Sequence, residues 1–400
     1  MNASVPVLPL GDLCHVVGGG TPPKDRPEYY NGDIPWATVR DMRTEVIADT
    51  EFKITSVAVA ASATNIIPAG NVIIATRVGL GKVCLIEQPT AINQDLRGVI
   101  PRDPQQLTVK YLFWWLKSVS HLIEKEGTGA TVQGVKLPFV KALGLPLRSL
   151  AEQRRIVAIL NEAFEGIATA KANAEKNLQS ARELYEGQLD SLFSSASARW
   201  PERALDQVAT IINGFAFKST DFQTTPGVRS IKITNVGVRE FVEDAGNHLP
   251  ASFAQKHAGV AVAGGSIVLA LTRTIIAGGL KVAVVPADFQ GALLNQRVAA
   301  IQPRAAELES SFLFFHLSTR RVMDYVKSRV NTLMQPNLSI ADLRRLPLPM
   351  PPISEQRELV ATLTRLDEES LRLESVYLRM LAALDELKKS LLHQAFNGAM

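Results

Sequence analysis

Two stretches of this chain carry nearly the same motif, and the motif marks an internal duplication. Residues 145–160 are LPLRSLAEQRRIVAIL, and residues 346–363 are LPLPMPPISEQRELVATL. Glu152 in the first stretch corresponds to Glu355 in the second, at a separation of 203 residues. A repeat of this length in a chain of 400 residues indicates two similar units. We therefore expect two related globular lobes, each followed by a helix that begins at this motif.

The two lobes share the same order of expected elements. The strand-like runs are residues 71–76, 82–86 and 96–100 in the first lobe and residues 266–270, 281–285 and 298–301 in the second. An Asn-Gln pair stands just before the third run in both lobes, as Asn93-Gln94 and as Asn295-Gln296. A helix follows in each lobe, near residues 108–124 and near residues 308–320. The agreement in order and register predicts one fold used twice.

The segments that follow the lobes are typical of long helices. No proline occurs between Glu152 and Ala196, and Ser149 with Glu152 forms a helix-capping box. Apolar residues step by four and three along the second segment, at Leu359, Leu363, Leu366, Ser370, Leu373, Tyr377, Met380, Leu384, Leu387 and Leu391. The positions 203 residues earlier are Ile156, Leu160, Ala163, Ile167, Ala170, Ala174, Asn177, Ala181, Leu184 and Gln188.

A leucine-rich seam and an alanine-rich seam predict that the two helices pack on each other as an antiparallel coiled coil. The alternative is that each helix packs only on its own lobe. The expected fold class is α+β, with two similar mixed α/β lobes of twisted β-sheet over residues 1–150 and 200–350. The helices over residues 151–199 and 351–400 separate them, and about 45 residues of helix would make a rigid spacer roughly 65 Å long.

Composition and charge narrow the class of protein. The chain is 46% hydrophobic, has no apolar run long enough to span a membrane, and begins without a basic and apolar leader, which predicts a cytoplasmic protein. Cys14 and Cys84 are flanked by apolar residues, which favours buried reduced thiols over a disulfide or a metal site. Residues 1–150 carry 15 Lys and Arg against 13 Asp and Glu, and residues 200–350 carry 16 against 11. The basic excess therefore lies on the lobes, which fits nucleic-acid binding there and also fits a random scatter of a few charges.

Motifs for catalysis are nearly absent. The sequence has no phosphate-binding loop for ATP, no amino-methyltransferase motif, no serine nucleophile elbow and no histidines at metal-ligand spacing. The run Gly18-Gly19-Gly20-Thr21 suits a turn or a phosphate cradle. Asp33 or Asp41 with Glu51 and Lys53 matches a metal-dependent nuclease pattern, but the second lobe has no equivalent.

The chain resembles the specificity subunits of type I restriction–modification enzymes over essentially its full length. The resemblance is carried by the lobe endings at residues 127–157 and 330–360, by the opening GGGTPPKDRPEYYNGDIPWATVRDM at residues 18–42, and by the Asn-Gln strands. The second lobe departs from this pattern, because its opening, IINGFAFKSTDFQTTPGVRSIKITNV, lacks the Gly-Thr-Pro and Ile-Pro-Trp of the first. Such differences suit two lobes that recognise different DNA sequences.

The resemblance implies a DNA-binding subunit without chemistry of its own. Its two lobes would be target-recognition domains that each read one half of a gapped double-stranded DNA site. Two modification subunits would supply methylation with S-adenosylmethionine, and restriction subunits would supply cleavage with ATP and Mg²⁺. No cofactor is expected in this chain. Two rival functions stay open from the residues alone: a stand-alone metal-dependent nuclease, and a coiled-coil protein-assembly scaffold.

Loop positions that match the recognition face of the family are the candidate DNA contacts. In the first lobe they are Lys24, Arg26, Tyr29, Tyr30, Trp36, Thr38, Arg40, Arg77, Thr128, Thr131, Gln133 and Lys136. In the second lobe they are Lys218, Lys232, Thr234, Asn235, Thr272, Arg273, Thr274, Arg329, Asn331, Thr332, Gln335 and Asn337. Arg and Lys suit phosphates and guanine, Asn and Gln suit adenine, and Thr methyl groups suit thymine. Trp36 and the Asn-Gln pairs are equally suited to structural roles.

Overall fold

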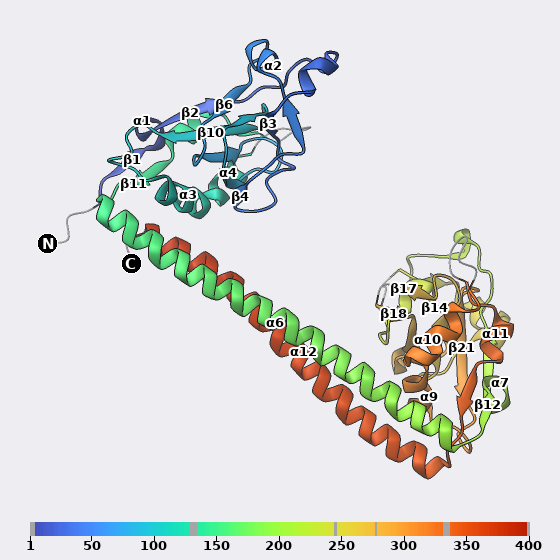
Figure 1. Cartoon of the computed structure of the whole chain (residues 1–400). Coiled ribbons are helices and arrows are strands. Elements are labelled where there is room, and N and C mark those ends of the chain that lie inside the picture. Colours follow the sequence, from blue (N-terminus) through green and yellow to red (C-terminus); the bar gives the residue numbers. More distant parts are fainter. Residues whose placement is uncertain (1–4, 128–133, 244–245, 277, 331–336, 398–400) are drawn as a thin grey trace. The chain divides into compact units, whose positions relative to one another are not determined.

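The computed structural model describes residues 5–127, 134–243, 246–276, 278–330 and 337–397 (Figure 1). The chain forms two compact units: Met1–Ala174 with Arg379–Met400, and Glu175–Leu378. Each unit contains one lobe and a part of both long helices, α6 (Leu150–Arg199) and α12 (Ile353–Phe396). Among the described residues, no helix is long and apolar enough to cross a membrane.

The first lobe is built on a five-stranded sheet with the order β2-β10-β7-β8-β4. These strands are β2 (Cys14–Gly18), β10 (Leu96–Pro101), β7 (Val72–Ala75), β8 (Val83–Ile86) and β4 (Val46–Ile47). A smaller sheet has the order β5-β3-β9-β6, with β5 (Phe52–Ile54), β3 (Ile34–Ala37), β9 (Thr90–Ile92) and β6 (Asn65–Ile67). The other elements are β1 (Val7–Pro9), β11 (Gly144–Pro146), α1 (Leu10–Leu13), η1 (Pro27–Tyr30), α2 (Ser56–Ala60), α3 (Val109–Ser118), α4 (Ser120–Glu126) and α5 (Leu137–Ala142).

The second lobe repeats four of the five strands of the larger sheet, with the order β13-β21-β16-β19. These strands are β13 (Ala209–Asn213), β21 (Val298–Pro303), β16 (Ile267–Ala270) and β19 (Val282–Val284). Its smaller sheet is three-stranded, β15-β14-β20, with β15 (His248–Leu249), β14 (Val228–Ile231) and β20 (Leu293–Leu294). The other strands are β12 (Glu202–Ala204), β17 (Ile275–Ile276), β18 (Gly279–Leu280) and β22 (Pro347–Pro349). The remaining helices are α7 (Leu205–Val208), η2 (Ser219–Asp221), η3 (Ile233–Asn235), α8 (Ser252–Lys256), η4 (Ala258–Val260), η5 (Ala287–Phe289), α9 (Ser310–Leu317), α10 (Arg320–Lys327) and α11 (Ile340–Arg344).

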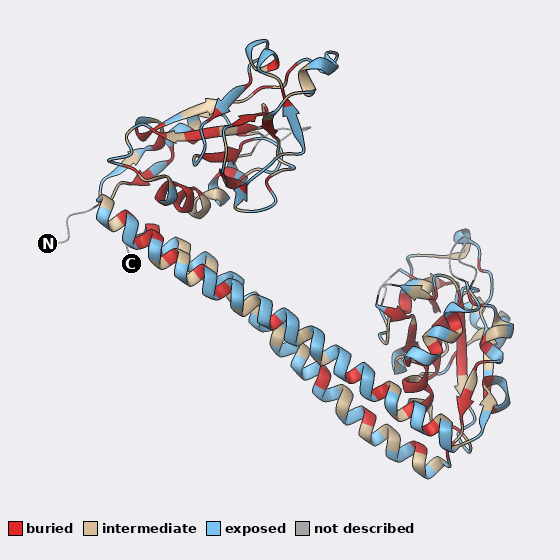
Figure 2. Cartoon of the chain, viewed as in Figure 1, coloured by how far each residue is buried: buried red, intermediate tan, exposed pale blue. Residues whose placement is uncertain are grey.

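The central strands have apolar residues on both faces because each larger sheet is covered on both sides. All four residues of β7 and of β16 are buried (Figure 2). The predicted strands are confirmed as β7, β8 and β10 in the first lobe and β16, β19 and β21 in the second. The helix predicted near residues 108–124 is divided into α3 and α4, which are separated at Val119. The helix predicted near residues 308–320 is confirmed as α9, and the additional helix α10 follows it.

The long helices pack together in opposite directions, as predicted. Within the first unit Lys171 of α6 pairs with Asp385 of α12 at 2.7 Å. Within the second unit Arg182 pairs with Glu374 at 2.8 Å. Partner numbers fall along α12 as they rise along α6, which is the mark of antiparallel helices. The alternative of two separate helices is therefore wrong.

Each lobe also packs on both helices of its own unit. In the first lobe Tyr111 of α3 contacts Phe396 near the end of α12, with ring centroids 5.2 Å apart. In the second lobe Phe312 of α9 contacts Phe193 near the end of α6, at 5.1 Å. Phe193 and Phe396 are equivalent in the repeat, so the two lobes use the same contact with the two helices exchanged.

The glutamine of each repeated Glu-Gln-Arg motif joins the lobe to its helix. Gln153 is fully buried; its carbonyl accepts hydrogen bonds from Thr108, and its amide donates to the backbone oxygens of Gln106 and Arg148. Gln356, also fully buried, accepts from the Glu309 backbone N–H and donates to two backbone oxygens in the same way. The motif is repeated because both lobes need this buried polar contact.

The predicted heptad seam is wrong over part of its length. Leu184 is 66% exposed, whereas its neighbours Tyr185 and Leu189 are buried against the second lobe. Leu373 and Met380 of α12 are also exposed, at 45% and 44%. A straight α-helix has 3.6 residues per turn and drifts from a 3.5-residue seam. Near its C-terminal end, α6 therefore buries the face that packs on the second lobe, which includes Tyr185 and Leu189 and leaves Leu184 exposed.

Cys14 and Cys84 are buried free thiols, as predicted. Burial raises the pKa of Cys14 to about 12 and that of Cys84 to about 11, so both stay protonated at neutral pH. The triple glycine also has a packing reason. A Cβ on Gly19 would lie 2.1 Å from the backbone oxygen of Asn93, and one on Gly20 would lie 2.5 Å from the backbone carbon of Ala63. Only glycine permits this close approach of backbones.

Candidate nucleic-acid interface

A pocket of about 560 Å³ in the first lobe gathers five of the predicted DNA contacts. Those five are Lys24, Tyr30, Trp36, Thr38 and Arg40. The other lining residues are Thr21, Val39, Phe52, Val78, Asn93, Gln94 and Asp95. They come from the segment after β2, from η1, from β3 and β5 of the smaller sheet, from the turn after β3, from the turn between β7 and β8, and from the loop after β9. The pocket therefore combines aromatic, amide, hydroxyl and basic groups at one end of the lobe.

The aromatic side of the pocket is fixed by hydrogen bonds and ring contacts. Trp36 is 7% exposed, and its indole Nε1 donates to the Gly20 backbone oxygen at 3.2 Å. Tyr30 and Phe52 meet the Trp36 ring edge to face, at 5.9 and 6.4 Å. The Tyr30 hydroxyl donates to the Pro22 backbone oxygen at 2.7 Å, and burial raises its pKa. Held in this way, the rings offer apolar contact area with little freedom to lose on binding.

The polar side is formed by the segment after β9. Thr21 Oγ1 donates to Gln94 Oε1, and Gln94 Nε2 donates to Asp95 Oδ2 at 3.5 Å, which uses one of its two N–H groups. Asn93 Nδ2 donates to Asp95 Oδ2 at 3.1 Å, and Arg77 Nε lies 3.7 Å from Asp95 Oδ1. Gln94 and Asp95 were not among the predicted contacts. The repeated Asn-Gln pair was the signal for Gln94, but the residues alone left a structural role equally open.

The turn after β3 presents Thr38 and Arg40. The Asp41 carboxylate holds this turn, because its Oδ2 accepts from Thr38 N at 2.7 Å and its Oδ1 accepts from Glu51 N at 2.8 Å. Arg40 is exposed and its Nη1 lies 3.9 Å from Glu51 Oε1, a weak surface pair that leaves the guanidinium available. Across the described parts of the chain, no group of three or more His, Cys, Asp or Glu side chains could hold a metal ion. The Asp41 carboxylate and the backbone N–H of Glu51 hold this turn through their hydrogen bond.

The other first-lobe predictions lie around this pocket or outside the described residues. Arg26 is exposed beside Glu28, at 3.4 Å, and Tyr29 packs against the small core under the pocket. The Val135 N–H donates to the Thr76 backbone oxygen at 2.8 Å, so the segment that carries exposed Lys136 runs beside Arg77. Thr128, Thr131 and Gln133 lie outside the described residues.

In the second lobe one group of predicted contacts surrounds η3. Exposed Thr234 lies in η3, and Lys232 precedes it with its Nζ 3.5 Å from the centre of the Phe222 ring. Phe222 directly follows η2, whose N-terminal flank is exposed Lys218. Asn235 is fully buried; its Oδ1 accepts from Lys232 N at 2.8 Å and its amide donates to the Val242 oxygen. Asn235 therefore shapes the turn that presents Lys232 and Thr234.

A second group lies beyond the end of β16. Thr272 forms an isolated antiparallel bridge with Asn337, and exposed Arg273 adopts a φ of 48°. Thr274 is fully buried. Exposed Arg329 lies over the Tyr325 ring at 3.7 Å.

One residue near this second group was missed by sequence reasoning. Lys281 of the loop before β19 donates to the Ile233 backbone oxygen at 2.7 Å, and burial together with the charge of Arg273 lowers its pKa. No motif signalled this contact. Three further predicted contacts, Asn331, Thr332 and Gln335, lie outside the described residues.

Comparisons with known proteins all point to one family. A family described as "Type I restriction modification DNA specificity domain" matches residues 4–178 and 198–377. The MjaVIII specificity subunit of Methanocaldococcus jannaschii is 24% identical over 380 residues, which are 90% of this chain and 85% of that protein. The EcoR124I/EcoR124II specificity subunit of Escherichia coli is 32% identical over 192 residues, which are 46% of this chain and 47% of that protein.

Solved structures show the same fold. A chain from a study of complex assembly and conformational transition of the type I restriction–modification system aligns with a TM-score of 0.78 at 19% identity, over 98% of both chains. The crystal structure of the HsdS subunit from Thermoanaerobacter tengcongensis aligns with a TM-score of 0.60 at 18% identity, over 100% of this chain and 98% of that one. The family match spans both lobes and most of both long helices. This chain therefore belongs to the family of type I restriction–modification specificity subunits, the non-catalytic subunits that determine DNA specificity.

Proposed function

We propose that this subunit binds a gapped, two-part site on double-stranded DNA and that each lobe reads one half of it. The proposed target-recognition domains are residues 1–150 and 200–350, and the helical segments 151–199 and 351–400 connect them. The first half of the site would be read by the pocket residues Lys24, Thr38, Arg40 and Gln94. The second half would be read by Lys218, Lys232, Thr234, Arg273 and Asn337.

One observation carries this proposal. The larger sheets of the two lobes share four strands in the same order, and both lobes have the same buried glutamine contact, but the exposed turns beside the smaller sheets carry different residues. The β3–β9 pairing of Ala37 with Ile92 corresponds to the β14–β20 pairing of Ile231 with Leu294. Arg40 in the first lobe therefore corresponds to Thr234 in the second. A shared framework with different contact groups is what two readers of different sequences require.

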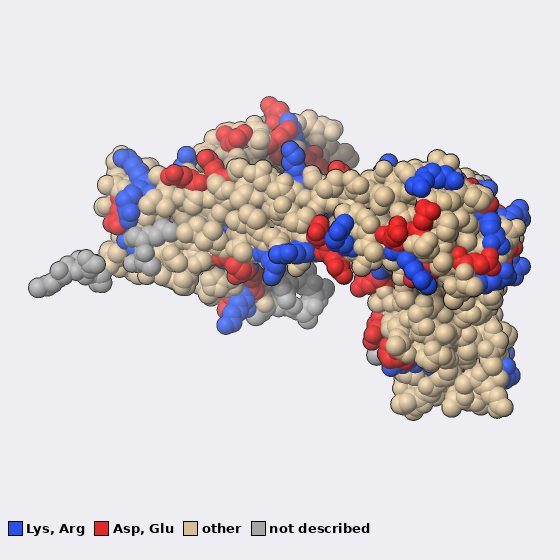
Figure 3. All heavy atoms as spheres, turned by 90° about the horizontal axis from the view of Figure 1, so that it is seen from below, with Lys and Arg blue, Asp and Glu red and all other residues tan. Residues whose placement is uncertain are grey.

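The long helices support a second part of the proposal, the binding of partner subunits. Within the second unit Leu184, Leu371 and Leu378 are 66%, 58% and 52% exposed. On the face of the molecule drawn in Figure 3, basic and acidic side chains are interspersed and broad areas carry neither. Leu371 and Leu378 lie seven residues apart on α12 and so share one face, and exposed apolar side chains that gather on one face are typical of surfaces that a partner covers. We propose that two modification subunits, which use S-adenosylmethionine, bind along the helices.

We further propose that restriction subunits, which use ATP and Mg²⁺, join this complex in the cytoplasm. The chain itself would hold no cofactor. A stand-alone nuclease is disfavoured, because the Asp41 carboxylate of the suspected metal motif is occupied by the backbone N–H groups of Thr38 and Glu51. A pure assembly scaffold is disfavoured by the basic and amide groups gathered in the first-lobe pocket.

Methylated bases mapped in host genomes with and without this gene test the proposal. The expected result is one gapped motif, methylated only when the gene is present. Purification with a modification subunit in excess should give one specificity chain with two partners. A continuous motif without a gap, or a stable complex with a single partner at saturation, would contradict the proposal.

A further inference from the structure

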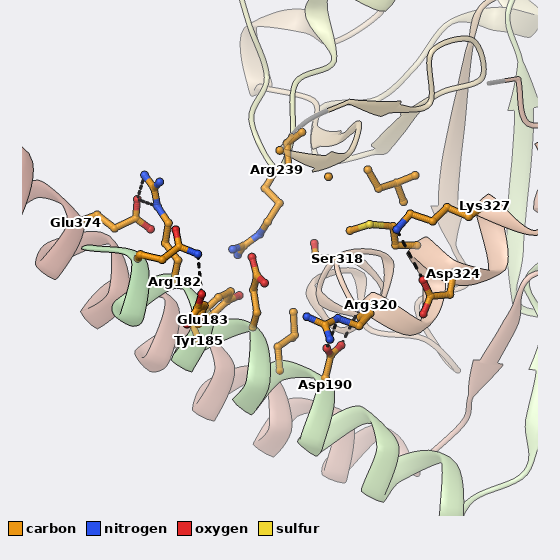
Figure 4. A pocket seen from close by; sticks show the side chains of 18 residues that line it. Arg182, Glu183, Tyr185, Asp190, Arg239, Ser318, Arg320, Asp324, Lys327 and Glu374 are labelled. Atoms are coloured by element: carbon orange, nitrogen blue, oxygen red, sulfur yellow. Dashed lines mark hydrogen bonds and ion pairs between the residues drawn. The ribbon is translucent and has the colours of Figure 1, made fainter. Parts of the chain in front are cut away.

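We call residues 38–41 of the first lobe and residues 232–235 of the second lobe the contact turns, because they present proposed DNA contacts. In the second lobe, the loop that follows the contact turn reaches both long helices through Arg239. Its Nη2 donates to Asp367 Oδ1 of α12 at 2.8 Å, and its guanidinium lies over the Tyr185 ring of α6 at 4.8 Å. Figure 4 shows the side chain descending from its loop toward α6, beside a pocket of about 790 Å³. Arg239 and Asp367 are only 26% and 23% exposed. Arg239 also has a φ of 60°, a conformation that side-chain-bearing residues rarely adopt.

The corresponding loop of the first lobe makes a contact of the same kind through Glu45. Glu45 Oε1 lies 3.2 Å from Lys388 Nζ of α12 and 3.8 Å from Lys117 Nζ of α3. Lys388 Nζ in turn lies 4.9 Å from the centre of the Phe164 ring of α6. Both lobes therefore place a charged loop residue in an ion pair with α12 and set a cation over an aromatic ring of α6.

Sequence register shows that the two contacts are equivalent. Glu45 lies four residues after Asp41, and Arg239 lies four residues after Asn235. Asp41 and Asn235 hold the proposed contact turns by accepting hydrogen bonds from the backbone N–H groups of Thr38 and Lys232.

The helix residues correspond as well. The separation of 203 residues between the helices relates Lys388 to Tyr185 and Asp367 to Phe164. The same two positions of the repeat are thus used at both sites. The position that carries the charged residue Lys388 at the first site carries the aromatic ring of Tyr185 at the second, and the position of the Phe164 ring carries the charged residue Asp367.

We propose that Glu45–Lys388 and Arg239–Asp367 are docking pairs of opposite polarity, which position the contact turn of each lobe and match each lobe to its own site on the helices. This inference rests on the proposed function, because the turns it positions are the proposed DNA contacts. A lobe placed at the wrong site would set Glu45 against Asp367, or Arg239 against Lys388. Either arrangement brings two like charges together, and repulsion of this kind discriminates strongly against a wrong partner.

Charge exchange at the second site tests the proposal in the full complex with modification subunits. The variants are Arg239→Glu, Arg239→Gly, Asp367→Arg and the double variant Arg239→Glu with Asp367→Arg. Glycine suits a φ of 60°, so Arg239→Gly removes the pair without adding backbone strain. Affinity is measured for a duplex with the methylated motif and for a duplex whose second half-site is scrambled. Thermal unfolding of each variant is recorded in parallel.

We expect Arg239→Glu to bind the complete motif about tenfold more weakly, a change of about 1.4 kcal/mol, and to discriminate less against the scrambled second half-site. Arg239→Gly should show a smaller loss of the same kind. The double variant should recover affinity to within about twofold of the unmodified complex. Recovery on charge exchange distinguishes positioning from a general loss of stability.

Arg229→Glu is the matched control. Arg229 forms an ion pair with Asp288 at 2.6 Å and lies over the Phe289 ring at 4.4 Å, but this pair lies within the lobe. The affinity of the Arg229→Glu complex for the complete motif should stay within about twofold of that of the unmodified complex. The proposal is overturned if Arg239→Glu binds like the unmodified complex, or if a folded double variant stays as weak as the single one. A failure of the proposed function would look different, because the unmodified complex itself would then not prefer the motif.

Discussion

The larger sheets of the two lobes share four strands in the same order, to which the first lobe adds β4, whereas the smaller sheets beside them carry different residues at matched positions. The first lobe has four short strands there and buries Trp36 under its pocket. The second has three strands and places Ser230 at the position of Trp36, with the Ser230 hydroxyl bonded to the Leu293 oxygen. Packing on the helices constrains the larger sheet, so it is retained. The turns beside the smaller sheet carry Thr38, Arg40, Lys232 and Thr234 among the proposed DNA contacts, so this part is free to vary.

The buried glutamines offer the strongest test of what the lobes share. Replacing Gln153 or Gln356 by Ala leaves backbone groups buried without partners, so each change should lower the unfolding free energy of its own lobe by about 3 kcal/mol. Thermal or denaturant unfolding, followed separately for each lobe, measures the loss. Exposed Arg154 is the control, and its change to Ala should cost less than about 0.5 kcal/mol. A large loss at only one glutamine would show that the two junctions are not equivalent.

The two lobes should differ in how their stability responds to acid pH. His316 in α9 is fully buried, and burial lowers its pKa to about 4 from 6.5, whereas the equivalent residue of the first lobe is Trp115. The unfolded second lobe therefore binds a proton below pH 6.5 that the folded lobe does not, so its stability falls as pH drops from about 6.5 toward 4. The expected loss between pH 6.5 and pH 5 is about 2 kcal/mol. His316→Gln should remove this pH dependence in the second lobe; its persistence would assign the effect elsewhere.

The contact turns should differ in the half-site that they affect. Arg40→Ala should weaken binding of the motif about tenfold and act at the first half-site alone, because one direct Arg contact contributes about 1–3 kcal/mol. The measurement compares duplexes with substitutions in each half-site. Lys53 follows pocket residue Phe52 on β5, and alternation along a strand directs it to the opposite face, which makes Lys53→Ala the control. An effect of Arg40→Ala at the second half-site would undo the assignment.

The smallest expected effect concerns phosphate contact. Lys136 is exposed beside the segment that carries Arg77, and we expect its side chain to contact the DNA backbone. Lys136→Ala should lower affinity similarly for all sequences and reduce the slope of log affinity against log salt by about 0.9. Titrations at several salt concentrations measure this slope. A change in sequence preference would instead show that Lys136 contacts a base.

The sequence predicted the elements that local pattern determines. The strands, the two long helices and their antiparallel pairing follow from apolar periodicity and from the repeat. The break after Ser118 and the seam around Leu184 did not, because they depend on which helix face the lobe covers. The resemblance to the family suggested Lys24, Tyr30, Trp36, Thr38 and Arg40 as contacts, and their residue types suit that role. The repeated Asn-Gln pair marked Gln94 but not its contact with Thr21, and no pattern marked Lys281, because both contacts join segments far apart in the chain.

The central claim is that each lobe reads its own half of the site. Exchange of residues 1–150 for the first lobe of another family member, followed by mapping of methylated bases in cells, tests it most directly. The account predicts that one half of the methylated motif changes while the gap and the other half stay the same. A change in both halves, or in neither, would contradict it.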